Sequence, residues 1–240
     1  MAFYDHFSQK EKMPTKAGLK LVKLQNKRIY KILSGFVNKK EIDILEIGPG
    51  RGAFAEECKI NKAEYVAIEI NQKLASDLSA NGIDIVKSKV PPLPFKPDTF
   101  DVVYMNQVFE HMNDIDMAQQ MIDECNRILK KDGLLCIISP DYLVWKEEFF
   151  NGDYTHNFIT TARRLEEIYY DHNLRVANIS YICGPFFGDM FTWLLGFFNG
   201  LLMRQKFIHR ITFGLISTEK VYKARTTFFR SVMVVGVKNE

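Results

Sequence analysis

The chain lacks the cysteine patterns of metal sites and of disulfide-stabilised folds. Its four cysteines, Cys58, Cys125, Cys136 and Cys183, are widely separated, and no two of them form a C-x-x-C pair. This scatter excludes a zinc ribbon or finger built on cysteine, and it favours a reducing compartment. We therefore expect no metal site and a cytoplasmic location.

Export signals, repeats and long apolar runs are also missing. The opening "MAFYDHFSQKEKM" has no apolar core of the kind found in signal peptides, so we expect no export. Without an internal repeat or a low-complexity linker, residues 1–240 are expected to form a single domain. The apolar run at residues 190–198 is too short to span a bilayer, which needs about 20 residues.

Charge is unevenly distributed along the chain. Residues 1–40 hold ten Lys/Arg and two acids, and residues 201–240 hold eight and two, which gives +8 and +6. Because the formal net charge is +3, the 160 residues between them carry 3 − 14 = −11. Basic ends suit an anionic surface, but solvated helix faces explain lysine-rich helices more often. We expect no nucleic acid partner and leave open peripheral membrane contact.

Hydrophobic patterning predicts helices and strands in alternation. Residues 16–36 form an amphipathic pattern, and short β-branched runs then alternate with helical segments. The predicted strands cover residues 43–47, 64–70, 83–88, 100–105 and 133–139. Such alternation is typical of an α/β, doubly wound, mostly parallel sheet, in which ligands bind beyond the carboxyl ends of the strands.

The stretch "LEIGPGRGAF" follows the first predicted strand and fits the loose pattern Gly48-x-Gly50-x-x-Ala53. A tight turn, a phosphate cradle and a site for another ligand all fit this pattern. A carboxylate at Glu46 disfavours a pyrophosphate and favours a ligand with positive charge, such as S-adenosylmethionine, which has an ammonium and a sulfonium. Glu69 ends the second strand, where an acid accepts ribose hydroxyls of either cofactor.

A family resemblance is carried by "ILEIGPGRG", "VAIEIN", "LPFKPDTFDVVYMNQVFEHM" and "ILKKDGLLCIISPD". In this order and spacing, they resemble the class I S-adenosylmethionine-dependent methyltransferases over residues 41–180. The resemblance implies a Rossmann-like seven-stranded sheet closed by an antiparallel edge strand at residues 230–238. It also implies S-adenosylmethionine as the cofactor.

The same resemblance assigns roles to residues. Glu46, Gly48, Gly50 and Gly52 would surround the methionine moiety, and Glu69 would hold the ribose. Ile70 would pack on the adenine, and Asn106 would border the methionine end. Relatives usually have an acid at the position of Lys89. This departure leaves adenine recognition to backbone groups near Val90.

A second, less specific resemblance involves "DYTHNF" at residues 153–158. It is similar to a D-x-T-H segment in members that modify saccharides or related metabolites, which places Asp153 and His156 on the substrate side. We therefore expect O-methylation of a small-molecule, glycan or lipid-linked acceptor.

A hydroxyl acceptor needs a general base, and imidazole titrates in the suitable range. His156 and His111 are the candidates, with Asp153 as an orienter of His156. A structural histidine remains an alternative for His111. A non-catalytic, cofactor-binding scaffold and an NAD-dependent dehydrogenase are the competing classes, and Glu46 and the lack of a recognisable second domain disfavour the dehydrogenase.

The domain is expected to divide into four segments. These are an N-terminal helical segment (1–40), the cofactor-binding core (41–184), a hydrophobic helical insertion (185–216) and a closing strand (217–240). The insertion is unusually aromatic and ends in Arg204, Lys206 and Arg210. A lid over the acceptor, a homodimer contact and a helix on an anionic membrane surface are all compatible with it.

Overall fold

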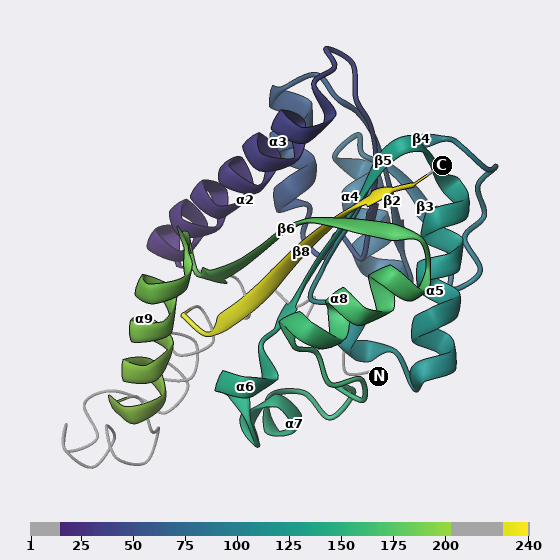
Figure 1. Cartoon of the computed structure of the whole chain (residues 1–240). Helices are drawn as coiled ribbons and strands as arrows, with labels where there is room; N and C mark the ends of the chain where they lie inside the picture. The colour runs from purple at the N-terminus through teal and green to yellow at the C-terminus, as the bar shows by residue number, and fades with distance from the viewer. Residues whose placement is uncertain (1–14, 203–227, 240) are drawn as a thin grey trace.

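In the part of the chain that the structure describes, eight strands form one sheet, and helices cover both of its faces (Figure 1). The computed structural model describes residues 15–202 and 228–239. The strand order is β3-β2-β1-β4-β5-β8-β6-β7. None of the helices in these described ranges is both long and apolar enough to cross a membrane.

The strands are β1 (Asp43–Ile47), β2 (Glu64–Glu69), β3 (Asp84–Lys87), β4 (Phe100–Asn106), β5 (Leu129–Pro140), β6 (Leu174–Cys183), β7 (Phe186–Phe187) and β8 (Arg230–Lys238). The helices are α2 (Lys16–Val37), α3 (Ala53–Ile60), α4 (Gln72–Ala80), the 3₁₀ turn η2 (Phe109–His111), α5 (Ile115–Ile128), α6 (Tyr142–Trp145), α7 (Glu148–Gly152), α8 (Ala162–Asp171) and α9 (Asp189–Leu202).

The α/β, doubly wound fold predicted from the sequence is confirmed. Strands β1 to β5 pair with one another in parallel, whereas β8 runs antiparallel to both β5 and β6. Two details differ from the prediction. The short β7 brings the number of strands to eight, and β8 lies between β5 and β6 instead of at the edge. Hydropathy cannot reveal this position, since it does not say which neighbours a buried strand pairs with.

Two apolar cores lie on opposite faces of the sheet. Helices α2 and α3 pack on one face through residues such as Ile29, Leu33 and Phe54. Helices α5 and α8 pack on the other through residues such as Met121 and Tyr169. Figure 1 shows these two helix pairs on either side of the strands. Strand alternation divides β1 in the same way, because Leu45 and Ile47 face α5 while Ile44 faces α2.

The predicted helix at 16–36 is confirmed as α2, but its ends are less buried than its centre. Leu19 and Phe36 are exposed, while Ile29 and Leu33 are fully buried. Arg28 connects this helix to the turn between β6 and β7, because it donates to the carbonyl oxygen of Pro185 at 2.8 Å.

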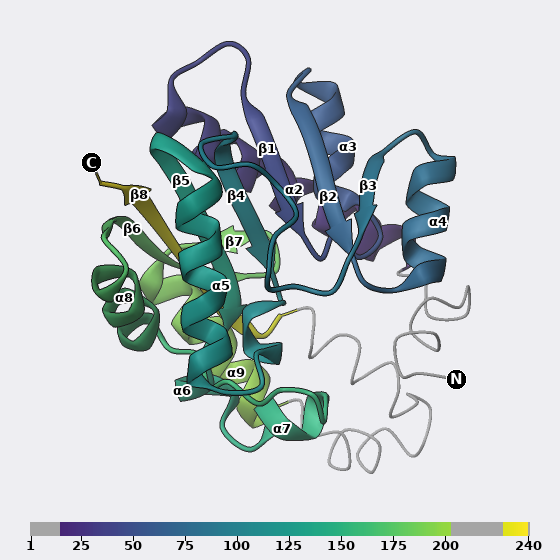
Figure 2. The ribbon, with the colours of Figure 1, turned by 90° about the vertical axis from the view of Figure 1, so that its right-hand side faces the viewer.

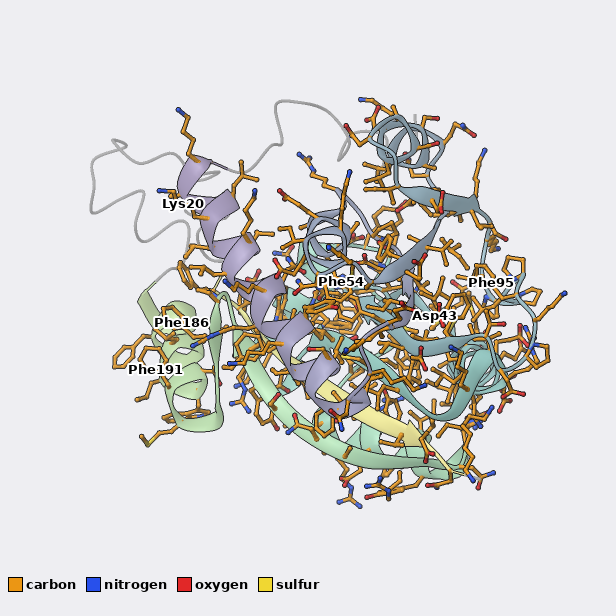
Figure 3. All side chains as sticks on the ribbon, turned by 90° about the horizontal axis from the view of Figure 1, so that it is seen from above. Lys20, Asp43, Phe54, Phe95, Phe186 and Phe191 are labelled. Carbon is orange, nitrogen blue, oxygen red and sulfur yellow. The ribbon has the colours of Figure 1, made fainter. Side chains whose placement is uncertain are left out.

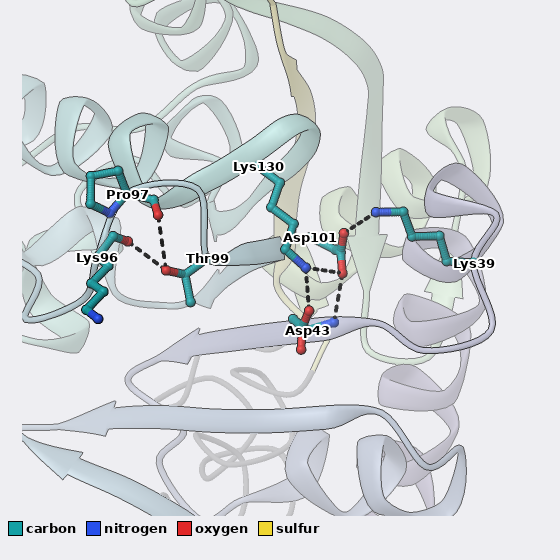
Figure 4. A network of polar contacts seen from close by, with 7 residues as sticks. All are labelled: Lys39, Asp43, Lys96, Pro97, Thr99, Asp101 and Lys130. Carbon is teal, nitrogen blue, oxygen red and sulfur yellow. Dashed lines mark hydrogen bonds and ion pairs between the residues drawn. The ribbon is translucent and has the colours of Figure 1, made fainter.

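A polar network joins the amino ends of three strands (Figure 4). The buried carboxylate of Asp101 on β4 accepts from the backbone N–H of Asp43 at 3.0 Å and pairs with Lys130 at 3.1 Å. Lys39, after α2, pairs with the same carboxylate. The network therefore fixes β1, β4 and β5 at the end of the sheet opposite to their carboxyl ends.

The aromatic insertion is only partly described. Helix α9 confirms a helix within the predicted 185–216 segment, whereas residues 203–216 lie outside the described ranges. Gly196 brings α9 against neighbouring side chains, since a Cβ there would meet Val144 at 3.3 Å and Arg230 at 3.5 Å. The outer side of the helix exposes large apolar side chains, namely Met190, Phe191, Trp193, Leu194 and Phe198. Figure 3 shows labelled Phe186 and Phe191 at the periphery of the molecule.

Candidate active site

The glycine loop lies between β1 and α3, at the carboxyl end of the sheet. Gly48, Gly50 and Gly52 have φ values of +71°, +55° and +75°, a region that L side chains rarely adopt. A Cβ on Gly48 would meet Val108 Cγ2 at 2.6 Å, so the loop packs directly on the segment after β4. A Cβ on Gly50 would meet nothing within 4 Å. Gly50 thus presents backbone to open space.

Gly52 serves packing in this structure. A Cβ there would meet Leu78 Cδ2 at 2.6 Å and Ile83 Cδ1 at 3.3 Å, which places the start of α3 against α4. A groove of about 450 Å³ adjoins Gly52 and reaches Glu64 and Asp84, the first residues of β2 and β3. That groove therefore extends from Arg51 and Gly52 of the loop to the amino ends of β2 and β3.

Glu69 closes β2 beside the glycine loop. Its carboxylate is buried and accepts from the backbone N–H of Asn71 at 2.8 Å. Burial raises the pKa of Glu69, and hydrogen bonds from the backbone N–H groups of Asn71, Gly50 and Ile70 oppose that rise. The carboxylate therefore connects the end of β2 to the central glycine of the loop.

The other predicted cofactor residues follow the ends of neighbouring strands. Ile70 is 59% exposed although it is apolar, and it lies directly after Glu69. Val90 is partly buried and packs on the core below α5, while Lys89 is exposed. Asn106 ends β4, next to β1 in the sheet. The structure therefore brings all of them to one end of the sheet.

Glu46 is buried near the end of β1, two residues before the first glycine of the loop. Its side chain is 4% exposed and accepts a short hydrogen bond from the Tyr65 hydroxyl. Burial raises the pKa of Glu46 to about 8, so the carboxyl is mostly protonated at neutral pH. A protonated Glu46 would not repel a pyrophosphate by its charge.

The two predicted histidines lie side by side. The ring centroids of His111 and His156 are 4.9 Å apart, although 45 positions separate the residues. His111 ends η2, directly after β4, and His156 belongs to the segment after α7. Figure 2 shows α6 and α7 at the lower end of the sheet.

A hydrogen-bonded chain fixes the tautomer of His111. The Thr155 hydroxyl donates to Asp153 Oδ1 at 2.7 Å, so its oxygen accepts from His111 Nδ1 at 2.8 Å. The ring's lone pair is then on Nε2. Burial, followed by the neighbouring His156, lowers the pKa of His111, which keeps the ring neutral at neutral pH. Asp153 thus orients His111 through Thr155, and not the His156 ring as predicted.

His156 is fixed by a different group. Its Nδ1 lies 2.6 Å from the carbonyl oxygen of Phe149, which can only accept, so Nδ1 is the donor. The side chain is 8% exposed, and its ring contacts that of Phe149 at 4.8 Å between centroids. Both imidazoles are therefore held through Nδ1.

Glu110 is a third polar group of this cluster, and the sequence analysis missed it. Its side chain is fully buried, and Oε2 accepts from the Ser139 hydroxyl at 3.0 Å. Within the described parts of the chain, Oε1 accepts no hydrogen bond. Burial raises the pKa of Glu110 to about 8. Its backbone carbonyl accepts from the N–H groups of Asn157 and Phe158 at 3.0 Å each, which joins η2 to the D-x-T-H segment.

Glu110 and Thr155 were not predicted from the sequence, although each had a signal in it. Glu110 directly precedes His111 after a buried strand, and Thr155 is the third residue of the D-x-T-H segment. Ser139 had no comparable signal, since it is one residue of an otherwise apolar strand.

Comparison with known proteins shows what this chain is similar to. The family described as "Methyltransferase domain" matches residues 45–137, from β1 into β5. An uncharacterized protein of Methanocaldococcus jannaschii is 34% identical over 122 residues, which cover 50% of this chain and 51% of that protein. A ubiquinone biosynthesis O-methyltransferase of Pelagibacter ubique is 30% identical over 117 residues, which cover 45% and 46%. The chain therefore spans about half the length of these curated relatives.

The fold has a counterpart of the same extent among solved structures. A SAM-dependent methyltransferase from Archaeoglobus fulgidus superposes with a TM-score of 0.63 at 20% identity, and the match covers 99% of this chain and 100% of that one. At this identity the likeness concerns the fold. Together, the family match over residues 45–137 and the fold show a methyltransferase domain in this chain, which is similar to the S-adenosylmethionine-dependent methyltransferases.

Proposed function

We propose that this protein transfers the methyl group of S-adenosylmethionine to a hydroxyl of a small-molecule, glycan or lipid-linked acceptor. The observation that carries the proposal is the pair of adjacent imidazoles after β4 and α7, each with Nδ1 hydrogen-bonded. An imidazole nitrogen near a methyl-donor site suits the removal of a hydroxyl proton.

The residues after β1 and β2 suit the cofactor. Gly50 leaves room for close approach of a ligand to the backbone, and Glu69 provides a carboxylate for ribose hydroxyls. The exposed side chain of Ile70 offers an apolar surface for a planar base. S-adenosylmethionine supplies an electrophilic methyl group on its sulfonium. The protein's part is to hold it in line with the acceptor oxygen.

His111 is the better placed of the two bases. A base that takes a proton becomes a cation, and the chain through Thr155 connects His111 to the Asp153 carboxylate. His156 instead donates to a neutral carbonyl and is nearly buried. We therefore assign proton removal to His111 and the positioning of its ring to His156, whose ring packs on it.

Oxygen as the methylated atom rests on two supports. A hydroxyl needs a base, which the histidine pair provides, and the name of the Pelagibacter relative describes an O-methyltransferase. The acceptor class rests on the resemblance of residues 153–158 to segments of saccharide-modifying members. It fits the position of His156 in that segment, next to His111.

The exposed apolar side of α9 supports a contact surface near the acceptor site. Helix α9 packs near Val144 of α6 through Gly196 while exposing Phe191 and Trp193. A lid, a second copy of the chain and an anionic membrane surface are its candidate occupants. Sedimentation with anionic liposomes at low and high salt tests the membrane, and light scattering tests the dimer.

Turnover measurements test the proposed function. Labelled S-adenosylmethionine is incubated with hydroxylated glycan, lipid and quinone precursors, and His111→Ala is compared with His172→Ala, whose ring pairs with Asp123 on the surface of α5. We expect His111→Ala to lower turnover by about 10²- to 10⁴-fold with cofactor affinity unchanged, and His172→Ala to behave as wild type. Cofactor binding without turnover on any acceptor class would instead indicate a non-catalytic scaffold.

A further inference from the structure

The cluster formed by Glu110, His111 and His156 has the composition of a metal site. Each residue offers one ligand atom, and the three atoms lie within 4.8 Å of one another. Two imidazole nitrogens and one carboxylate oxygen are the protein ligands of many catalytic zinc sites, which keep a further position open. Such a ligand set also suits other divalent first-row metals.

The buried carboxylate of Glu110 is a second, independent indication. Its side chain is fully buried, yet Oε1 accepts no hydrogen bond from any described residue. A buried polar atom without a partner costs free energy, and a bound cation removes that cost. Oε2 is already satisfied by Ser139, so the carboxylate keeps one oxygen available in a fixed orientation.

The hydrogen bonds of the two histidines complete the indication. In both rings Nδ1 is engaged, with Thr155 Oγ1 and with the carbonyl oxygen of Phe149. These bonds leave the lone pair on Nε2, as in metal-ligating histidines that donate their other N–H to a second group. Thr155, Phe149 and Ser139 would then be the positioning groups of the site.

We propose that Glu110, His111 and His156 bind one divalent first-row metal ion of the zinc type, with an open position for the acceptor oxygen. Ligands held at about 2.1 Å around a tetrahedral ion lie about 3.4 Å apart, so binding draws the three side chains together. A hydroxyl bound to the ion would become more acidic, so that its proton could pass to solvent water while His111 serves as a ligand instead of as the base. The metal's role in turnover rests on the proposed function, whereas its binding does not.

Metal titration of the chelator-treated full chain tests the site without any acceptor. We expect one Zn²⁺ per chain by calorimetry, competition by Co²⁺, and visible Co²⁺ absorption without thiolate charge transfer. Glu110→Gln and the double variant His111→Ala/His156→Ala should lose this binding, while His172→Ala keeps it. Ser139→Ala should weaken it by about 10- to 100-fold, the scale of losses at groups that orient metal ligands.

Several results would overturn the site. Wild-type protein that binds neither ion, binding that survives in the double variant, or a thiolate charge-transfer band from the cysteines would each exclude it. The wild-type titration and spectra alone can exclude the metal site, even where a variant fails to fold. Failure of the proposed function has a different signature, since metal would bind normally while no acceptor is methylated.

Discussion

Glu69 is the residue whose contacts most directly connect the strand end to the glycine loop. Its carboxylate accepts from the backbone N–H of Asn71 and of Gly50. With the ribose as a further donor, Glu69→Ala should weaken S-adenosylmethionine binding by about 1.5–3 kcal/mol, the scale of hydrogen bonds to charged groups. Glu64→Ala, an exposed acid at the other end of β2, is the control. Unchanged affinity of Glu69→Ala in calorimetry would refute the ribose assignment.

Glu46 gives the stability of the protein a specific pH dependence. Its folded pKa is about 8, above the unfolded value of 4.5, so the folded state holds a proton that the unfolded state releases. The free energy of unfolding therefore falls as pH rises from about 4.5 to 8. Glu110 acts in the same window.

The substitution Glu46→Gln should flatten this fall, because the amide cannot ionise and its oxygen still accepts from Tyr65. Urea unfolding with a chelator present, between pH 5 and 8, measures the slope, and the fall due to Glu110 should remain. An unaltered slope in Glu46→Gln would mean that Glu46 is ionised in the folded protein.

At the scale of single residues, the sequence predicted positions better than partners. The spacing of Gly48 and Gly50 predicted a tight loop, because positive φ favours glycine wherever a chain turns sharply. The predicted partner of Asp153, His156, was wrong. Asp153 Oδ1 accepts from the N–H and the hydroxyl of Thr155 within a local turn. Such a turn produces no periodic pattern in the sequence. Hydrogen bonds between side chains depend on such turns and cannot be derived from residue type.

Between elements, the Asp101 network holds three strands in register at their amino ends (Figure 4). Burial alone would raise the pKa of Asp101, but bonds from Lys39, the Asp43 N–H and Lys130 outweigh it and lower the pKa. The carboxylate therefore adds stability above the unfolded pKa of 3.8, and this part is lost as pH falls through the folded pKa.

Replacing this carboxylate should alter both stability and its acid dependence. Asp101→Asn should lower the free energy of unfolding at pH 7 by about 1.5–3 kcal/mol, the scale of hydrogen bonds to a charged group. The loss of stability below about pH 4 should shrink in parallel. Asp98→Asn, which affects an exposed pair with Lys238, provides the comparison in chemical denaturation. Equal stability of the two variants would contradict the account of the network.

A second ion pair joins β8 to the segment that leads into the site. Arg230 and Asp141 are both buried, with Nε and Oδ2 3.3 Å apart, and the guanidinium lies 3.4 Å from the Tyr181 ring centre. Trp145 also donates to the carbonyl oxygen of Arg230 at 2.8 Å. The start of β8 thus supports α6, which precedes the D-x-T-H segment.

Arg230→Met should therefore destabilise the protein by about 3–5 kcal/mol, since it leaves the Asp141 carboxylate buried without its cation. Arg163→Met removes an exposed pair on α8 and should cause no measurable loss. Thermal unfolding of the two variants compares them. A normal melting temperature for Arg230→Met would show that the pair is not needed for stability.

For the whole molecule, the alternation of strands and helices was sufficient to predict the layered sheet. Parallel strands joined by helices have few possible arrangements. The strands predicted at residues 43–47, 64–70 and 100–105 correspond to β1, β2 and β4, which are neighbours in the sheet. The insertion of β8 between β5 and β6 could not be predicted, because an antiparallel strand is free to pair on either side. The histidine pair likewise depends on tertiary contacts across 45 positions.

The central claim is that the loop after β1 binds S-adenosylmethionine with Gly50 against the ligand. Calorimetric titration of wild type, Gly50→Leu and Gly82→Leu with S-adenosylmethionine tests it most directly. Both glycines have positive φ and open space around an added Cβ, so their leucine variants bear comparable strain. We predict binding to wild type and Gly82→Leu and none to Gly50→Leu. No binding to wild type, or equal binding to Gly50→Leu, would contradict the account.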